Sequence, residues 1–133
     1  MRKGAESVAW QTRGEWTAVG LWLVLQLTLT SLPGSAIPIN LPHPLDWIGH
    51  FSMYFGLGFL VARAGVLRSW PARRLLLVAL VISVFAALDE LHQLLIPGRD
   101  AEVGDWIVDT LGGSLGLSAG WQVMASRFGS WLR

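Results

Sequence analysis

Residues 87–113 read ALDELHQLLIPGRDAEVGDWIVDTLGG, and this stretch holds most of the acidic residues of an otherwise apolar chain. It directly follows residues 75–86, which contain no ionisable side chain. A charged side chain inside hydrocarbon is costly and needs a partner, a proton, a metal ion or water. The stretch therefore predicts two helices that cross a bilayer, joined at Pro97-Gly98, with a polar site near the end where they meet.

The composition is typical of a membrane protein with one domain. Hydrophobic residues make up 53% of the 133 residues and charged residues 14%, whereas soluble proteins have roughly 45–50% apolar and 25% charged residues. A chain of this length predicts a single domain, residues 1–133. The absence of cysteine excludes a disulfide framework, and a formal charge of +1 argues against a nucleic-acid partner.

Four segments come close in length to the ~20 apolar residues that a helix needs to cross ~30 Å of hydrocarbon. They comprise about residues 16–32, 46–62, 74–96 and 105–125. The chain is thus predicted to be all-α, a polytopic membrane protein built as a four-transmembrane-helix bundle. The first segment also resembles a cleaved signal peptide, with Gly34-Ser35-Ala36 as the cleavage site. Its apolar stretch exceeds the usual ~7–15 residues, which favours a retained helix.

Positive charges predict the orientation, because the cytoplasmic loops of membrane proteins are enriched in Lys and Arg. Nine of the ten lie before the first segment, between the second and third, or after the fourth: Arg2, Lys3, Arg13, Arg63, Arg68, Arg73, Arg74, Arg127 and Arg133. Both termini are therefore expected in the cytoplasm. The three histidines and most of the acidic residues fall at the opposite, outer end.

Polar side chains on three of these segments are predicted to meet just below the outer surface. Spacings of three, four and seven residues place them on one face of each helix, and the helical rise of ~1.5 Å per residue places them at similar depths. The candidate binding residues are Asp46, His50, Tyr54, Asp89, Glu90, His92, Gln93, Arg99, Asp105 and Asp109. Of these, His50, Glu90 and Asp89 are also the candidates for catalysis, since ionisable groups within a membrane are functional candidates by default.

Several partners are open to these groups. The candidate acid–histidine pairs are Asp46 with His50 and Asp89 with His92. Arg99 either reaches into the polar layer or pairs with Asp100 or Glu102 at the surface. Asp105 follows Gly104 and is also placed to cap the fourth helix.

Glycines continue the acidic face of the last segment. Gly112, Gly116 and Gly120 recur every four residues, and small residues at that spacing let two membrane helices approach closely. They are therefore predicted to pack the last helix against a neighbour rather than to bind a ligand. A weaker strip of small residues lies on the second segment and comprises Gly49, Ser52 and Gly56.

Two stretches, LDWIGHFSMYFGLG at 45–58 and LDELHQLLIPGRDAEVGDWIVDTLGGSLG at 88–116, resemble the VanZ-like membrane family. Its pattern is an Asp, a His four residues later and a nearby Tyr, then an acid and Gln before Pro-Gly-Arg, then an Asp-led, Gly-rich helix. The resemblance covers about residues 46–120 and points to Asp46, His50, Tyr54, Glu90, Gln93, Arg99, Asp105, Gly112 and Gly116. The chain departs from the family at Trp47, where Lys is frequent, and at Asp109, where Asn is frequent.

The resemblance implies a protein of the bacterial cytoplasmic (inner) membrane and the cell envelope. The family takes its name from a member associated with resistance to the glycopeptide antibiotic teicoplanin, and it has no agreed reaction. The fold and a site are thus expected from the resemblance, and a mechanism is not.

Two classes of function fit these observations. In the first, the polar layer binds an envelope lipid headgroup, a lipid-linked precursor or an amphiphilic antibiotic. In the second, the protein is a membrane-embedded hydrolase or transferase that uses acid–base or metal-assisted catalysis. No spacing such as HExxH is present, so no metal ligand is assigned and a divalent cation stays open. Replacing Glu90, His50 or Arg99 is expected to abolish an envelope phenotype.

Overall fold

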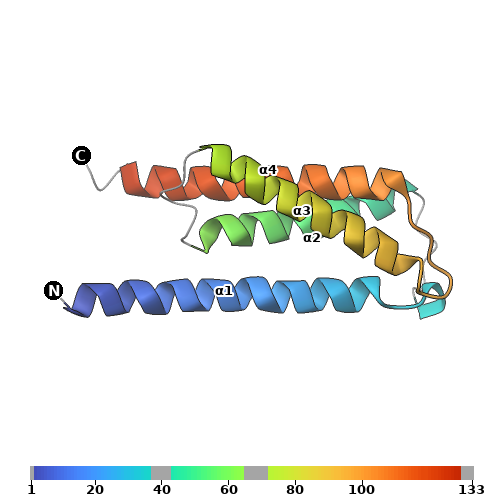
Figure 1. The fold of residues 1–133 in the computed structure, drawn as a ribbon, viewed down its shortest axis with the longest axis horizontal. Coiled ribbons are helices and arrows are strands. Elements are labelled where there is room, and N and C mark those ends of the chain that lie inside the picture. Colours follow the sequence, from blue (N-terminus) through green and yellow to red (C-terminus); the bar gives the residue numbers. More distant parts are fainter. Residues whose placement is uncertain (1, 37–42, 65–71, 130–133) are drawn as a thin grey trace.

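The computed structural model describes residues 2–36, 43–64 and 72–129, with side chains for 14–36, 45–64 and 73–125. Its helices are α1 (Arg2–Thr30), α2 (His43–Arg63), α3 (Ala72–Gln93) and α4 (Val103–Gly129), with a short 3₁₀ turn, η1, at Gly34–Ala36. Successive helices run in opposite directions, so α1 begins at the end of the bundle where α4 ends (Figure 1). The described residues form no strand, which confirms the all-α prediction.

The glycine stripe of α4 packs directly on the backbone of α2. A Cβ atom on Gly112 or Gly116 would overlap the carbonyl oxygen of Phe51 or Phe55, respectively. Gly120 repeats this arrangement one turn later, against Phe59. We call this contact the glycine seam. The prediction that these glycines pack α4 against a neighbour is confirmed, and the neighbour is α2.

The strip of small residues noted on the second segment has three different surroundings in α2. Gly49 has open space where a Cβ would stand, and Gly56 faces the indole of Trp22 in α1. The hydroxyl of Ser52 donates to the Ile48 carbonyl within its own helix. Among the glycines of α2, Gly58 is the one that meets α4 closely, where a Cβ would overlap the Gly113 carbonyl. The face of α2 that packs on α4 therefore includes Gly58 rather than Gly49 and Gly56.

Between α1, α2 and α3 lies a small apolar core. It contains the buried side chains of Val19, Tyr54, Leu57, Ile82 and Ala86. The Trp22 indole donates a hydrogen bond of 2.9 Å to the Met53 carbonyl and so attaches α1 to α2. The outward faces are apolar as well, and on α3 they include the largely exposed Leu76, Val81 and Leu88.

Two Pro-Gly turns meet at the end of the bundle where α1 and α3 finish. Ile96–Arg99 form a turn that is closed by a hydrogen bond from the Arg99 amide to the Ile96 carbonyl. Gly98 occupies the third position of this turn and has the positive φ of 75° that the position requires. The Gly34 amide donates to the Pro97 carbonyl, and a Cβ on Gly34 would overlap the Gly98 carbonyl. The α-helix of α3 ends at Gln93 rather than at the predicted Ile96, because the chain tightens into three-residue turns before the proline.

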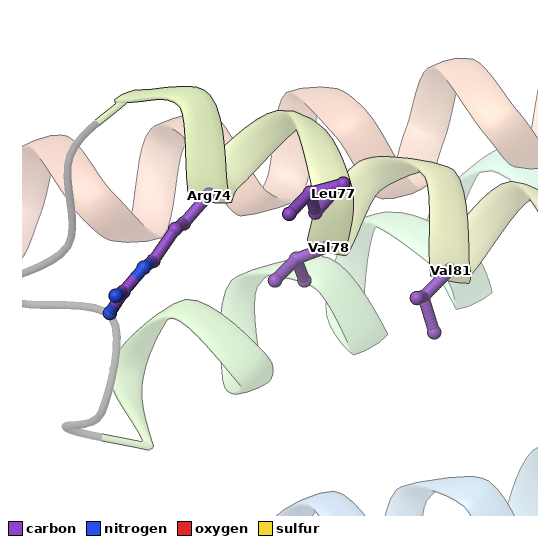
Figure 2. A pocket seen from close by; sticks show the side chains of 4 residues that line it. All are labelled: Arg74, Leu77, Val78 and Val81. Atoms are coloured by element: carbon purple, nitrogen blue, oxygen red, sulfur yellow. The ribbon is translucent and has the colours of Figure 1, made fainter.

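Of the described helices, α3 is the one that is long and apolar enough to cross a membrane by length and composition. In α1, α2 and α4 the apolar residues are interspersed with Trp, Gly and acidic residues. An open apolar groove runs along the start of α3 beside Leu77, Val78 and Val81, with Arg74 at its edge (Figure 2). A second open apolar groove lies between α1 and α2.

Candidate functional site

Ionisable side chains from three helices meet near the end of the bundle that carries the Pro-Gly turns. We call this group the polar cluster; it consists of Asp46 and His50 from α2, Glu90 from α3, and Asp105 and Asp109 from α4. Its members are buried or half-buried, and Asp109 is only 1% exposed. The predicted convergence of three helices is therefore present in the structure.

His50 lies at the centre of the cluster, and its Nδ1 edge faces two acids. Nδ1 is 3.2 Å from each carboxylate oxygen of Asp109 and 4.0 Å from Oε1 of Glu90. A neutral imidazole with its proton on Nδ1 donates to Asp109 and leaves Nε2 as an acceptor, whereas an imidazolium donates from both nitrogens. The partner of His50 is thus mainly Asp109 on the facing helix.

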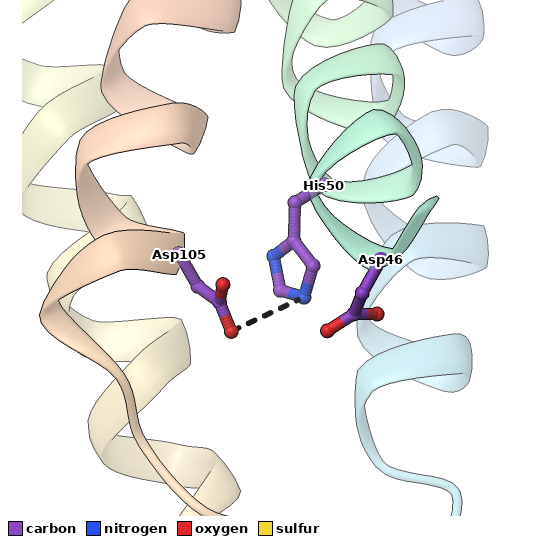
Figure 3. A group of neighbouring side chains, drawn as sticks. All are labelled: Asp46, His50 and Asp105. Carbon is purple, nitrogen blue, oxygen red and sulfur yellow. Dashed lines mark ion pairs between the residues drawn. The ribbon is translucent and has the colours of Figure 1, made fainter. Parts of the chain in front are cut away.

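The Nε2 edge of His50 faces the other two acids. Figure 3 shows the imidazole between Asp105 of α4 and Asp46 of its own helix, with Nε2 3.8 Å from Asp105 Oδ2. Asp105 is 6% exposed, and its Oδ1 has no hydrogen-bond partner in the structure. Because Asp46 and His50 are only half-buried, this edge is the more accessible side of the polar cluster.

Glu90 joins the cluster to the start of α4. Its Oε1 accepts a 3.3 Å hydrogen bond from the Gln93 amide, and its Oε2 accepts one of 3.0 Å from the backbone N–H of Glu102. The predicted capping role of Asp105 is wrong, because α4 already begins at Val103. Asp105 instead lies in the first turn of α4 with its side chain beside His50.

Asp89 belongs to a separate hydrogen-bonded group next to the polar cluster. It accepts a 3.1 Å bond from the Tyr54 hydroxyl and a 2.9 Å bond from the Thr30 hydroxyl. The candidate pair of Asp89 with His92 does not form, because the two side chains face different partners. His92 Nε2 lies 3.1 Å from the Ser31 hydroxyl, so both residues connect α3 to the end of α1.

Arg99 also binds α1. Its guanidinium donates to the carbonyls of Leu32 (3.3 Å) and Leu29 (3.2 Å). These carbonyls lie at and just beyond the carboxyl end of α1, where cations and donors are favourable because the last carbonyls lack helical partners. The structure thus places Arg99 in a structural contact rather than in an ion pair with the acids of the polar layer.

The sequence interpretation missed the contribution of α1. Thr30 and Ser31 were not candidates, and neither was Gln26, which is 1% exposed and has no hydrogen-bond partner at either amide atom. Gln26 lies close to Tyr54. The available signal was modest: Gln26 is the one amide side chain within the apolar residues 16–32, and the site was expected to form from the other three helices.

One comparison with known proteins identifies the family of this chain. An antiparallel four-helix bundle with one strongly apolar helix, and with ionisable side chains buried between helices, indicates a helical membrane protein. The model of the VanZ/LLP1 family matches residues 7–124. The chain belongs to this family, and the match includes α1, to which the sequence resemblance did not extend. Neither a curated protein nor a solved structure matches the chain significantly.

Proposed function

We propose that the chain is a single domain, residues 1–133, that spans the bacterial cytoplasmic membrane four times with both termini in the cytoplasm. The 22 residues of α3 correspond to roughly 33 Å of helix, enough for ~30 Å of hydrocarbon. Its outward leucines and valines, among them Leu76, Leu80 and Val84, are more than half exposed, which suits lipid rather than water. The clustering of Lys and Arg supports the orientation.

Reporter fusions test this topology. A reporter that is active only outside the cytoplasm is expected to be inactive when fused after Arg133 and active when inserted after Asp100, because the Pro97–Gly104 connection lies at the outer end. A cytoplasmic reporter at the same two positions provides the matched control and should give the opposite pattern. An active external reporter after Arg133 would overturn the proposed orientation.

At the outer surface, the polar cluster binds the polar headgroup of an envelope amphiphile. The class of ligand includes envelope lipids, lipid-linked precursors and amphiphilic antibiotics of the teicoplanin type. The observation that carries this function is the burial of carboxylates from α3 and α4 around the imidazole of His50 from α2. Groups of this kind within a membrane are expensive, and a purely structural role is better served by apolar packing.

The charge of the polar cluster restricts the ligand. Within the described residues, the ion pairs of the cluster all use His50, and Arg99 is engaged with the carbonyls of α1. The cluster therefore favours an amine or another cationic group, or an anionic headgroup that is accompanied by a cation. Arg99 does not enter this proposal as a binding residue, because its guanidinium supports the end of α1.

Charge-removing substitutions in the polar cluster test this function. Glu90→Gln is expected to abolish the envelope phenotype, measured as survival of cells challenged with a glycopeptide antibiotic, with normal amounts of protein in the membrane. His50→Gln is expected to abolish it as well, after survival is corrected for the smaller amount of this less stable variant in the membrane. Both substitutions keep a hydrogen-bonding side chain of similar size. Asp100→Asn, which removes an exposed acid at the same end, is the matched control and should retain wild-type survival. Wild-type survival of both cluster variants would contradict the proposal.

A second candidate function is an enzyme, and one observation favours it. The Asp109 carboxylate is placed to hold Nδ1 of His50 and leave Nε2 at the more accessible edge, an arrangement of base and orienting acid. Incubation of the purified protein with a lipid-linked envelope precursor, followed by mass spectrometry, separates the two functions. A new product that is absent with His50→Gln would establish catalysis. An unchanged precursor would leave binding as the proposed function.

A further inference from the structure

The edge of the polar cluster formed by Asp46, His50 and Asp105 has the dimensions of a metal-binding site. One ligand atom from each side chain lies within 4.8 Å of the other two, and His50 Nε2 is 3.8 Å from Asp105 Oδ2. Two ligands that each lie ~2.1 Å from a tetrahedral zinc ion are roughly 3.4 Å apart. Small side-chain rotations would therefore bring these three groups to a common ion.

An independent observation at this edge points to a missing partner. Asp105 is 6% exposed, and its Oδ1 has no hydrogen-bond partner; the Trp47 side chain lies near enough to stabilise the carboxylate but makes no hydrogen bond to Oδ1. A buried carboxylate oxygen without a donor is unfavourable, and such atoms are uncommon in folded proteins. The Asp105 side chain points toward His50, with Oδ2 nearest to Nε2 (Figure 3), so a cation that the carboxylate binds through both oxygens would also satisfy the unpaired Oδ1.

The Nδ1 edge of the imidazole makes the kind of contact that supports a metal-binding histidine from behind. A metal-binding histidine almost always donates its second ring N–H to a carboxylate, a carbonyl or water. His50 Nδ1 lies 3.2 Å from both oxygens of Asp109, which fits this arrangement. Glu90, the other acid at that edge, already accepts hydrogen bonds from Gln93 and Glu102. Asp109 and Glu90 could also coordinate an ion with Nδ1, but their engaged oxygens favour the Nε2 edge.

We infer that Asp46, His50 Nε2 and Asp105 bind one divalent cation of the zinc or manganese type, with Asp109 as the positioning residue for the imidazole. One imidazole and two carboxylates suit first-row ions that accept both nitrogen and oxygen, whereas Mg²⁺ and Ca²⁺ prefer oxygen ligands alone. Three protein ligands leave a coordination position for an anionic oxygen of a headgroup. This inference deepens the proposed function and rests on it for the class of ligand.

Metal binding to the purified full-length protein in detergent tests the inference. After removal of metal with a chelator, titration with Zn²⁺ and Mn²⁺ by calorimetry is expected to show one saturable site per chain for at least one of the two ions. Asp105→Asn and Asp46→Asn should each weaken binding at least tenfold, and Asp109→Asn should weaken it 10- to 100-fold through the orientation of His50. Asp100→Asn is the matched control and should bind as the wild type does.

Several results of these titrations would overturn the inference. No saturable binding of either ion would overturn the inference, as would wild-type affinity in both Asp46→Asn and Asp105→Asn. Loss of binding only in Glu90→Gln would also overturn it, because the ion would then lie at the Nδ1 edge. Because Asp46 is half-buried, its variant is expected to fold even if Asp105→Asn does not. A protein that binds no metal but needs Glu90 for antibiotic survival would refute this inference and leave the proposed function standing.

Discussion

Replacing His50 by leucine is expected to lower the free energy of unfolding by about 3–5 kcal/mol, measured in detergent with a chelator present. The imidazole is the basic group that faces Glu90, Asp105 and Asp109. Its removal takes the positive partner from the buried carboxylates of Asp105 and Asp109, and an uncompensated buried charge is far more destabilising than the loss of a surface ion pair. Leucine has a similar volume, so the loss reflects charge rather than a cavity.

A second substitution distinguishes charge from packing. Adding Asp109→Asn to His50→Leu removes the nearest unpaired carboxylate and should recover at least half of the lost stability. The double variant then measures the coupling between the two residues. If His50→Leu were as stable as the wild type, or if Asp109→Asn gave no recovery, the cluster would not be held by the charge of His50.

Replacing Gly116 by alanine is expected to reduce stability by about 1–3 kcal/mol, as overpacking of a close contact does. The new methyl group would overlap the backbone carbonyl of Phe55, and a backbone atom cannot rotate away as a side chain does. The helices α2 and α4 would have to separate, which also moves His50 away from Asp109. The unfolding midpoint in a denaturing-detergent titration measures the change.

The matched control is Gly49→Ala, which also lies in a helix but has open space at its Cβ position. Alanine favours a helix over glycine by up to ~1 kcal/mol, so this variant should be equal to or more stable than the wild type. Equal stability of Gly116→Ala and Gly49→Ala would show that the glycine seam contributes nothing specific.

The sequence predicted the convergence of about half of the candidate residues, but not how they pair, and Asp89, His92 and Arg99 have partners outside the polar cluster. Helical periodicity and the cost of charge in hydrocarbon bring His50, Glu90 and Asp109 together whatever the details of packing. The choice of partner depends on the rotation of each helix, which spacing does not determine. His50 therefore faces Asp109 on α4 as its main partner, although Asp46 is one turn away in its own helix.

The same limit explains two further differences. Gly49 and Gly58 are both small residues of α2, and only the rotation of the helix decides that Gly58 meets α4. The proposed metal-binding group of Asp46, His50 and Asp105 also could not be recognised from the spacing of its residues in the sequence, because Asp46 and His50 lie on α2 whereas Asp105 lies on α4. Thr30 was missed for another reason: an uncharged hydroxyl near the end of an apolar helix gives no energetic signal until its acceptor, Asp89, is known.

The glycine seam joins two of the four helices along their backbones. α2 and α4 touch at Gly112, Gly116 and Gly120, and these two helices carry Asp46, His50, Asp105 and Asp109. Glu90 lies on α3, which meets the seam through side chains such as Ile82. A headgroup bound as proposed would therefore be accommodated more easily by displacement of α3 or α1 than by separation of α2 from α4.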